Sequence, residues 1–148
     1  MTDLEIRYEK GRMVIHLEEF LSCRSEAKVR KLLKIIQRSY TSEVADQIQQ
    51  HIKERYSGID GLAKISANQV ARFTEEVNNI EHDIEVWKSQ RARFKKSEKG
   101  WEHYNENLKK SRKILKDAKS SLCSVKREFN NHMRDKVFFE KLLSAIFS

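Results

Sequence analysis

The sequence predicts a mainly α-helical protein: an N-terminal β-hairpin with two short helices, then a long antiparallel coiled-coil hairpin and a short C-terminal helix. Composition is the first support, because 148 residues with no proline, four glycines and 35% charged residues favour long exposed helices. The second support is a heptad spacing of apolar residues in the second half of the chain. The third is an alternation of apolar and polar residues near the N-terminus, which is typical of a half-buried strand.

The N-terminal module is expected to span residues 1–57 and to open on the β-hairpin. Residues 4–8 alternate apolar and polar, residues 13–17 are Met-Val-Ile-His-Leu, and Gly11 between them suits the positive φ of a tight turn. Because an isolated hairpin is only marginally stable in water, we expect it to pack against the rest of the module.

Two short helices are expected to complete this module. Ser22 or Ser25 can cap the first helix, in which four apolar residues follow helical spacing. These residues are Val29, Leu32, Leu33 and Ile36. Thr41 or Ser42 can cap the second helix, which is expected to end near Tyr56.

Glycines at positions 58 and 61 predict a helix break and a domain boundary, after which residues 62–134 form the coiled-coil hairpin. One heptad stripe runs from Val70 to Phe94 and a second from Trp101 to His132, with a glycine-containing turn at residues 97–100 between them. In an antiparallel pair, residues at the same height have numbers that sum to a constant. A sum of 195 fills every apolar layer from both helices, so we expect contacts close to that register.

Residues 136–148 are expected to form a short apolar C-terminal helix. Eight of the eleven residues from 137 to 147 are apolar, so this helix must be buried against another surface. We expect it to cover the N-terminal module at the base of the hairpin, with contact to a second copy in a homodimer as the alternative. The stretch is too short to cross a membrane and residues 1–5 lack signal-peptide features, so a cytoplasmic protein without membrane contact is expected.

The sequence contains no recognisable constellation of catalytic or metal-ligating residues. The five histidines are scattered, and none stands at metal-ligand spacing from a cysteine. Cys23 and Cys123 lie far apart in the sequence, which fits neither a disulfide framework nor a nucleophile motif. The sequence therefore predicts a protein that is not an enzyme and that uses no metal and no cofactor.

The formal net charge of +8 points to an acidic partner such as nucleic acid. Residues 73–87 carry five acids and no Lys or Arg, so this arm is expected to offset the basic residues 110–119 that face it. Two basic surfaces remain, the helix at residues 24–38 and the hairpin tip at residues 88–99, each with a net charge of +5. The candidate nucleic-acid-binding or partner-binding residues are Lys28, Arg30, Lys31, Lys34, Arg38, Lys88, Arg91, Arg93, Lys95, Lys96 and Lys99.

Aromatic residues accompany the basic tip. Phe94, Trp101 and Tyr104 lie beside its cations in the sequence, a combination that suits a nucleic-acid strand. The alternative is that these rings close the last layers of the coiled coil, because all three occupy heptad positions.

A resemblance to known proteins rests on residues 5–8, Gly11, residues 14–21 and residues 28–36. In these residues the first part of the chain resembles the N-terminal module of small proteins of bacterial mobile elements, which include type II anti-CRISPR proteins. The resemblance covers roughly residues 1–55 and assigns no functional residue. It implies a non-enzymatic inhibitor that binds the type II RNA-guided effector nuclease, its guide RNA or their complex. Two alternatives stay open: a nucleic-acid-binding accessory protein of a plasmid or transposon, and a coiled-coil adaptor without nucleic-acid contact.

Overall fold

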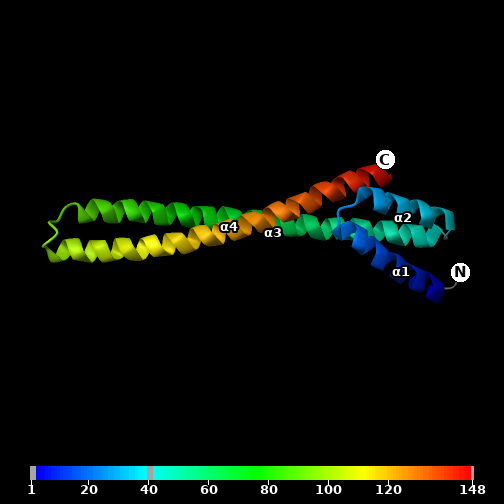
Figure 1. Ribbon diagram of the computed structural model, residues 1–148, viewed down its shortest axis with the longest axis horizontal. Helices are drawn as coiled ribbons and strands as arrows, with labels where there is room; N and C mark the ends of the chain where they lie inside the picture. Colours follow the sequence, from blue (N-terminus) through cyan, green and yellow to red (C-terminus); the bar gives the residue numbers. More distant parts are fainter. Residues whose placement is uncertain (1–2, 40–41, 148) are drawn as a thin grey trace. The chain divides into compact units, whose positions relative to one another are not determined.

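The computed structural model describes residues 3–39 and 42–147, with side chains described for residues 10–38 and 42–145. These described residues form four helices: α1 (Asp3–Ser22), α2 (Glu26–Ser39), α3 (Ser42–Arg91) and α4 (Lys99–Phe147) (Figure 1). These described ranges contain no strand, so the mainly helical class is confirmed and the N-terminal β-hairpin is wrong. The chain divides into two compact units, one formed by the described residues up to Ala63 and from His132 onward, the other by Lys64–Asn131.

Helix α1 replaces the expected β-hairpin because its apolar residues serve a helical face. Met13, Leu17 and Leu21 are buried at steps of four residues. A strand would place Ile15 on the same face as Met13 and Leu17, yet Ile15 is 64% exposed. Gly11 lies inside the helix, and no described glycine has a positive φ. The alternation in the sequence is therefore incidental, and burial follows a period of 3.6 residues.

The expected first helix of the module is confirmed as α2, with its predicted apolar face, Val29 to Ile36, fully or almost fully buried. Ser25 caps its N-terminus, because the Oγ atom accepts a hydrogen bond from the backbone N–H of Lys28 at 3.4 Å. The preceding residue, Arg24, has a φ of 50°, and the N–H of Ser25 bonds the carbonyl of Phe20 at 3.1 Å. This left-handed residue ends α1 and turns the chain into α2. Of the expected caps of the next helix, Thr41 lies outside the described residues and Ser42 is the first residue of α3.

The predicted helix break at Gly58 and Gly61 is wrong, because α3 continues through both glycines. Ile52, Ile59 and Ala63 are buried on one face that keeps heptad spacing across this stretch. A glycine in a helix interior costs about 1 kcal/mol relative to alanine. Burial of this continuous face offsets that cost, so the helix is not interrupted.

The C-terminal apolar segment is the end of α4 and not a separate short helix, which corrects the expected element at residues 136–148. Phe139 and Leu142 lie in the core of the first unit, together with residues of α1, α2 and the first part of α3. The apolar segment thus covers the N-terminal helices, as its composition indicates. Polar contacts at the edge of this core join Glu18 to His51 and Arg55, Arg24 to Asp135, Tyr56 to Glu140, and Lys136 to Asp60.

The second unit is an antiparallel hairpin of α3 and α4, and it confirms the predicted long helical hairpin. All stripe residues from Val70 to Arg91 and from Trp101 to Phe129 are buried or half-buried. Residue pairs in contact across this hairpin have numbers that sum to between 191, for Trp87 with Tyr104, and 200, for Glu81 with Lys119. The register is therefore centred near the predicted sum of 195, since displacement by one heptad would change these sums by seven.

The turn of the hairpin covers residues 92–98, earlier in the chain than the predicted turn at 97–100. Gly100 lies in the first turn of α4, where the ring of Phe94 packs on it. A Cβ atom at position 100 would stand 2.5 Å from a carbon of that ring. Gly100 is therefore required for the close approach of Phe94, not for a left-handed turn.

Candidate nucleic-acid interface

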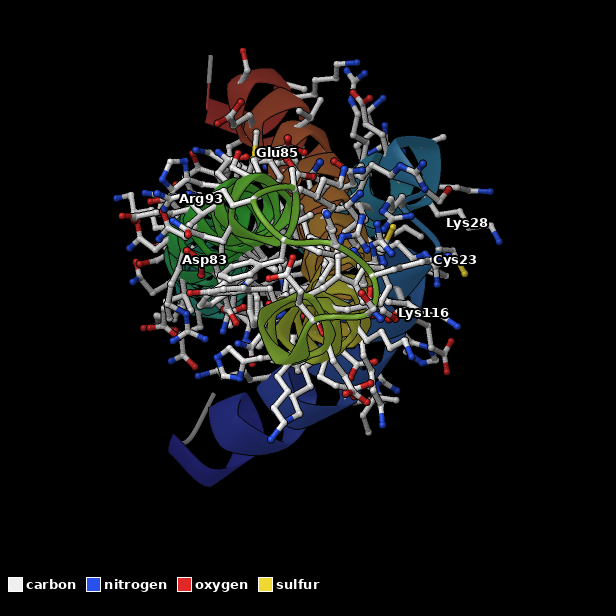
Figure 2. The ribbon with its side chains drawn as sticks, turned by 90° about the vertical axis from the view of Figure 1, so that its left-hand side faces the viewer. Cys23, Lys28, Asp83, Glu85, Arg93 and Lys116 are labelled. Atoms are coloured by element: carbon white, nitrogen blue, oxygen red, sulfur yellow. The ribbon has the colours of Figure 1, made fainter. Side chains whose placement is uncertain are left out.

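The predicted basic residues of α2 all lie exposed on that helix: Lys28, Arg30, Lys31, Lys34 and Arg38. The guanidinium of Arg30 stands 3.9 Å from the Glu26 carboxylate, so part of its charge is compensated. The Nζ atom of Lys28 lies 5.8 Å from the centre of the Phe20 ring, a cation–π contact. Figure 2 shows the Lys28 side chain pointing outward. The remaining cations of α2 are available to a partner.

Arg91 at the hairpin tip holds the two arms together instead of presenting a free cation. Its Nη1 atom donates a hydrogen bond to the side-chain oxygen of Asn105 at 2.8 Å, and its guanidinium carbon lies 5.5 Å from the centre of the Trp101 ring. The residue is half-buried at a heptad position. The hydrogen bond and the cation–π contact compensate for placing a charge between the helices.

The other predicted tip cations differ in the contacts that they make with neighbouring side chains. Lys88 pairs with Glu85 at 3.2 Å, and Arg93 donates to the side-chain oxygen of Gln90 at 3.2 Å. Lys96 lies 5.7 Å from the centre of the Trp101 ring. Lys95 and Lys99 are exposed, and in the described part of the chain their ammonium groups have no acidic side chain within ion-pair distance. The Glu98 carboxylate accepts a hydrogen bond from the backbone N–H of Lys95 at 2.9 Å.

The aromatic rings of the tip contact each other and nearby cations. The ring of Tyr104 lies 6.0 Å from that of Trp87 and 5.8 Å from that of Phe94, measured between ring centres. Trp101 already contacts two cations. These contacts favour the structural explanation of the rings, which is that they close the end of the coiled coil. The tip thus offers cations rather than free ring faces.

A third and longer basic surface lies along α4, and sequence reasoning discounted it by expecting the acidic arm to offset its charge. Residues 109–127 contain eight Lys or Arg and a single acid, Asp117, for a net charge of +7. Most of these cations recur every three or four residues, so they lie on one side of the helix. We call this set the α4 basic row: Lys109, Arg112, Lys113, Lys116, Lys119, Lys126 and Arg127. All seven are exposed, and at 1.5 Å per residue the row extends over about 27 Å.

The acidic arm offsets only part of the α4 basic row. Lys119 reaches Glu81 on the opposite arm at 3.5 Å, and Lys109 pairs with Glu106 on its own helix at 3.5 Å. Asp83 and Lys116, in contrast, point to opposite sides of the hairpin (Figure 2). Acids and bases at matching heights therefore do not all meet, because height along a helix does not determine the side on which a residue lies.

Three consecutive members of the row carry uncompensated charge. Arg112, Lys113 and Lys116 have no acidic side chain within ion-pair distance among the residues described. They lie within two turns of a well-formed helix, and their side chains are exposed. This arrangement concentrates positive potential on one side of the hairpin and suits a polyanion.

In the described ranges, no three His, Cys, Asp or Glu side chains gather closely enough to hold a metal ion, and Cys23 and Cys123 are exposed free thiols. None of the described helices combines the length and apolar character needed to cross a bilayer.

Comparisons with protein-family models, curated protein sequences and solved structures find no match to this chain. The resemblance noted from the sequence included a β-hairpin, and the corresponding residues form α1 in the structure. Function must therefore be argued from the charged surfaces themselves.

Proposed function

We propose that this protein binds the phosphate backbone of double-helical nucleic acid, without catalysis, through the α4 basic row. The observation that carries the proposal is the exposed and unpaired state of Arg112, Lys113 and Lys116. Cations of this kind displace counterions condensed on a nucleic acid, and this release is the main source of sequence-independent affinity.

The form of the row favours a duplex over a single strand. A helix presents its cations at a fixed spacing, which matches a regular backbone better than a flexible one. Single-strand binders also use aromatic faces on which bases stack. The row contains no aromatic residue, and the rings at the tip contact one another and the cations beside them. Contacts of this kind position a duplex without reading its sequence.

The proposal is tested by fluorescence anisotropy with a short labelled DNA duplex at low salt. The triple variant Arg112→Gln, Lys113→Gln, Lys116→Gln is expected to bind at least about tenfold more weakly than the natural protein, since three phosphate contacts are lost. The matched control is Lys28→Gln, Lys31→Gln, Lys34→Gln on α2, which removes the same charge and is expected to change affinity less than about threefold. Equal losses in the two variants, or no binding by the natural protein, would contradict the proposal.

Inhibition of a type II RNA-guided nuclease stays a prediction from the sequence resemblance. The α4 basic row supports it to the extent that such a surface could hold a guide RNA duplex. A cleavage assay with the effector nuclease and its guide tests it. Undiminished cleavage at a large excess of the protein would remove this prediction without affecting the duplex-binding proposal.

A further inference from the structure

A groove between α1 and α2 has a chemistry that differs from that of the α4 basic row. Its volume is about 330 Å³, and it is lined by His16 and Phe20 of α1 and by Lys28, Lys31, Leu32 and Ile35 of α2. Phe20, Leu32 and Ile35 supply an apolar lining, while the lysines stand along the α2 side. An apolar cavity of about 150 Å³ is enough to hold benzene, so this groove has room for two large apolar side chains.

Among the apolar residues that line the groove, Ile35 is the exposed one, because Phe20 is half-buried and Leu32 is buried. Ile35 is 47% exposed, although it lies between Leu32 and Ile36, which pack in the core. Its position on α2 is one turn beyond Lys31 and two turns beyond Lys28, so the three residues share one face of the helix. Ile35 is continuous with Phe20 and Leu32 in the groove, and an apolar patch bordered by charged residues is typical of a docking surface.

The charges around the groove define the partner. Lys28 and Lys31 have no acidic side chain within ion-pair distance among the described residues, and Arg38 extends the same face by one further turn. A partner must therefore bring carboxylates to these cations and apolar side chains to the groove. An amphipathic helix with apolar residues one turn apart and acids beside them meets both requirements.

We propose that the groove between α1 and α2 binds the apolar face of an acidic amphipathic helix from a partner protein. Two apolar side chains of that helix fill the space over Leu32 and Ile35. Its carboxylates pair with Lys31 and with Lys28, whose Nζ atom lies over the Phe20 ring. A nucleic-acid backbone fits this surface less well, since phosphates and sugars gain nothing from an apolar lining. The groove and the α4 basic row thus serve two partners of different chemistry.

The probe is a synthetic helical peptide with two leucines one turn apart on one face and glutamates on either side of them. Titration into the ¹⁵N-labelled full-length protein is expected to shift the amide signals of the groove residues. Ile35→Asp is expected to weaken peptide binding at least about tenfold, because it places a like charge where an apolar side chain should dock. The same peptide with glutamine in place of glutamate is expected to bind about tenfold more weakly.

Ile15→Asp is the matched control. Ile15 is 64% exposed on α1 and does not line the groove, so this change adds the same charge outside the site and should leave peptide affinity within about twofold. Circular dichroism verifies that both variants are folded. The proposal is overturned if the peptide shows no saturable binding, or if Ile15→Asp weakens it as much as Ile35→Asp does. It is also overturned if a DNA duplex shifts the groove amides more strongly than the peptide does.

Discussion

The two compact units bury their apolar residues to different extents. In the first unit, Leu17, Ile36, Ile48 and Leu142 from four different helices are fully buried in one core. In the hairpin, most stripe residues are half-buried, and Leu108 is one of few large side chains that reach full burial. Four helices can enclose a side chain on all sides, whereas two helices shield only the line along which they meet.

The two units also differ in what their charges do. Acids and bases at the edge of the first unit join its helices, as Glu18 does with His51 and Arg55. On the hairpin, Arg112 and Lys116 have no acidic partner among the residues described. From these differences in burial and charge we infer that the first unit provides most of the stability, whereas the hairpin chiefly provides exposed, charged surface.

The largest expected effect comes from truncating a matched pair of leucines on α4. Leu142→Ala removes a fully buried side chain from the four-helix core and should cost about 2–5 kcal/mol of unfolding free energy. Leu122→Ala removes a half-buried side chain from the hairpin and should cost about 1–2 kcal/mol. Urea denaturation followed by circular dichroism measures both values. Equal losses of unfolding free energy in the two variants would contradict the proposed difference between the units.

A matched pair of glycines gives a smaller effect, with opposite signs in the two units. Gly61 lies inside α3 with open space around it, so Gly61→Ala should raise the free energy of unfolding by about 0.5–1 kcal/mol. Gly100→Ala should lower it by about 0.5–1 kcal/mol, because the new methyl group displaces Phe94 from its stack on Tyr104. Thermal denaturation detects the signs, and a stabilised Gly100→Ala variant would argue against the Phe94 packing.

Alkaline pH is expected to give the smallest effect, and it acts on the first unit. Burial raises the pKa of Tyr56, with a further increase from its hydrogen bond to Glu140, and the hydrogen bond to Asp60 raises the pKa of Lys136. Both groups hold their protons to a higher pH when folded than when unfolded. Their contribution to stability is therefore complete below about pH 10 and is lost as pH rises through the folded-state pKa values.

Urea midpoints at about pH 9 and pH 11 measure this loss. The double variant Tyr56→Phe, Lys136→Met should show a smaller decrease between the two pH values than the natural protein. A decrease of the same size in both proteins would mean that other groups determine the alkaline sensitivity.

Much of the helical fold was predictable because its signals are local. The buried face of α2 and the stripes of the hairpin follow from spacings of three and four residues. The helical state of α1 was not predictable in this way. Its buried residues Met13, Leu17 and Leu21 share one core with residues of α2, α3 and α4, and those of α3 and α4 lie far away in the sequence. Tertiary packing therefore overrode a local alternation that is typical of a strand.

The continuity of α3 and the α4 basic row were missed for related reasons. The heptad spacing of Ile52, Ile59 and Ala63 already crosses the two glycines, and this signal outweighs their low helix propensity. The α4 basic row was missed because its cations and the acids of residues 73–87 lie at matching positions along the two arms, which suggested that their charges neutralise each other. Asp83 and Lys116 do not neutralise each other because they lie on opposite sides of the hairpin. The side on which a residue lies depends on its angular position around the helix, not on its position along the helix axis.

The salt dependence of duplex binding tests most directly whether the α4 basic row contacts a nucleic-acid backbone. Each phosphate contact contributes about −0.9 to the slope of log K against log salt concentration. The variant Arg112→Gln, Lys113→Gln, Lys116→Gln is expected to have a slope shallower by about 2–3 than that of the natural protein, and the α2 control variant a slope changed by less than about 0.5. Identical slopes for the natural protein and the α4 variant would contradict the account.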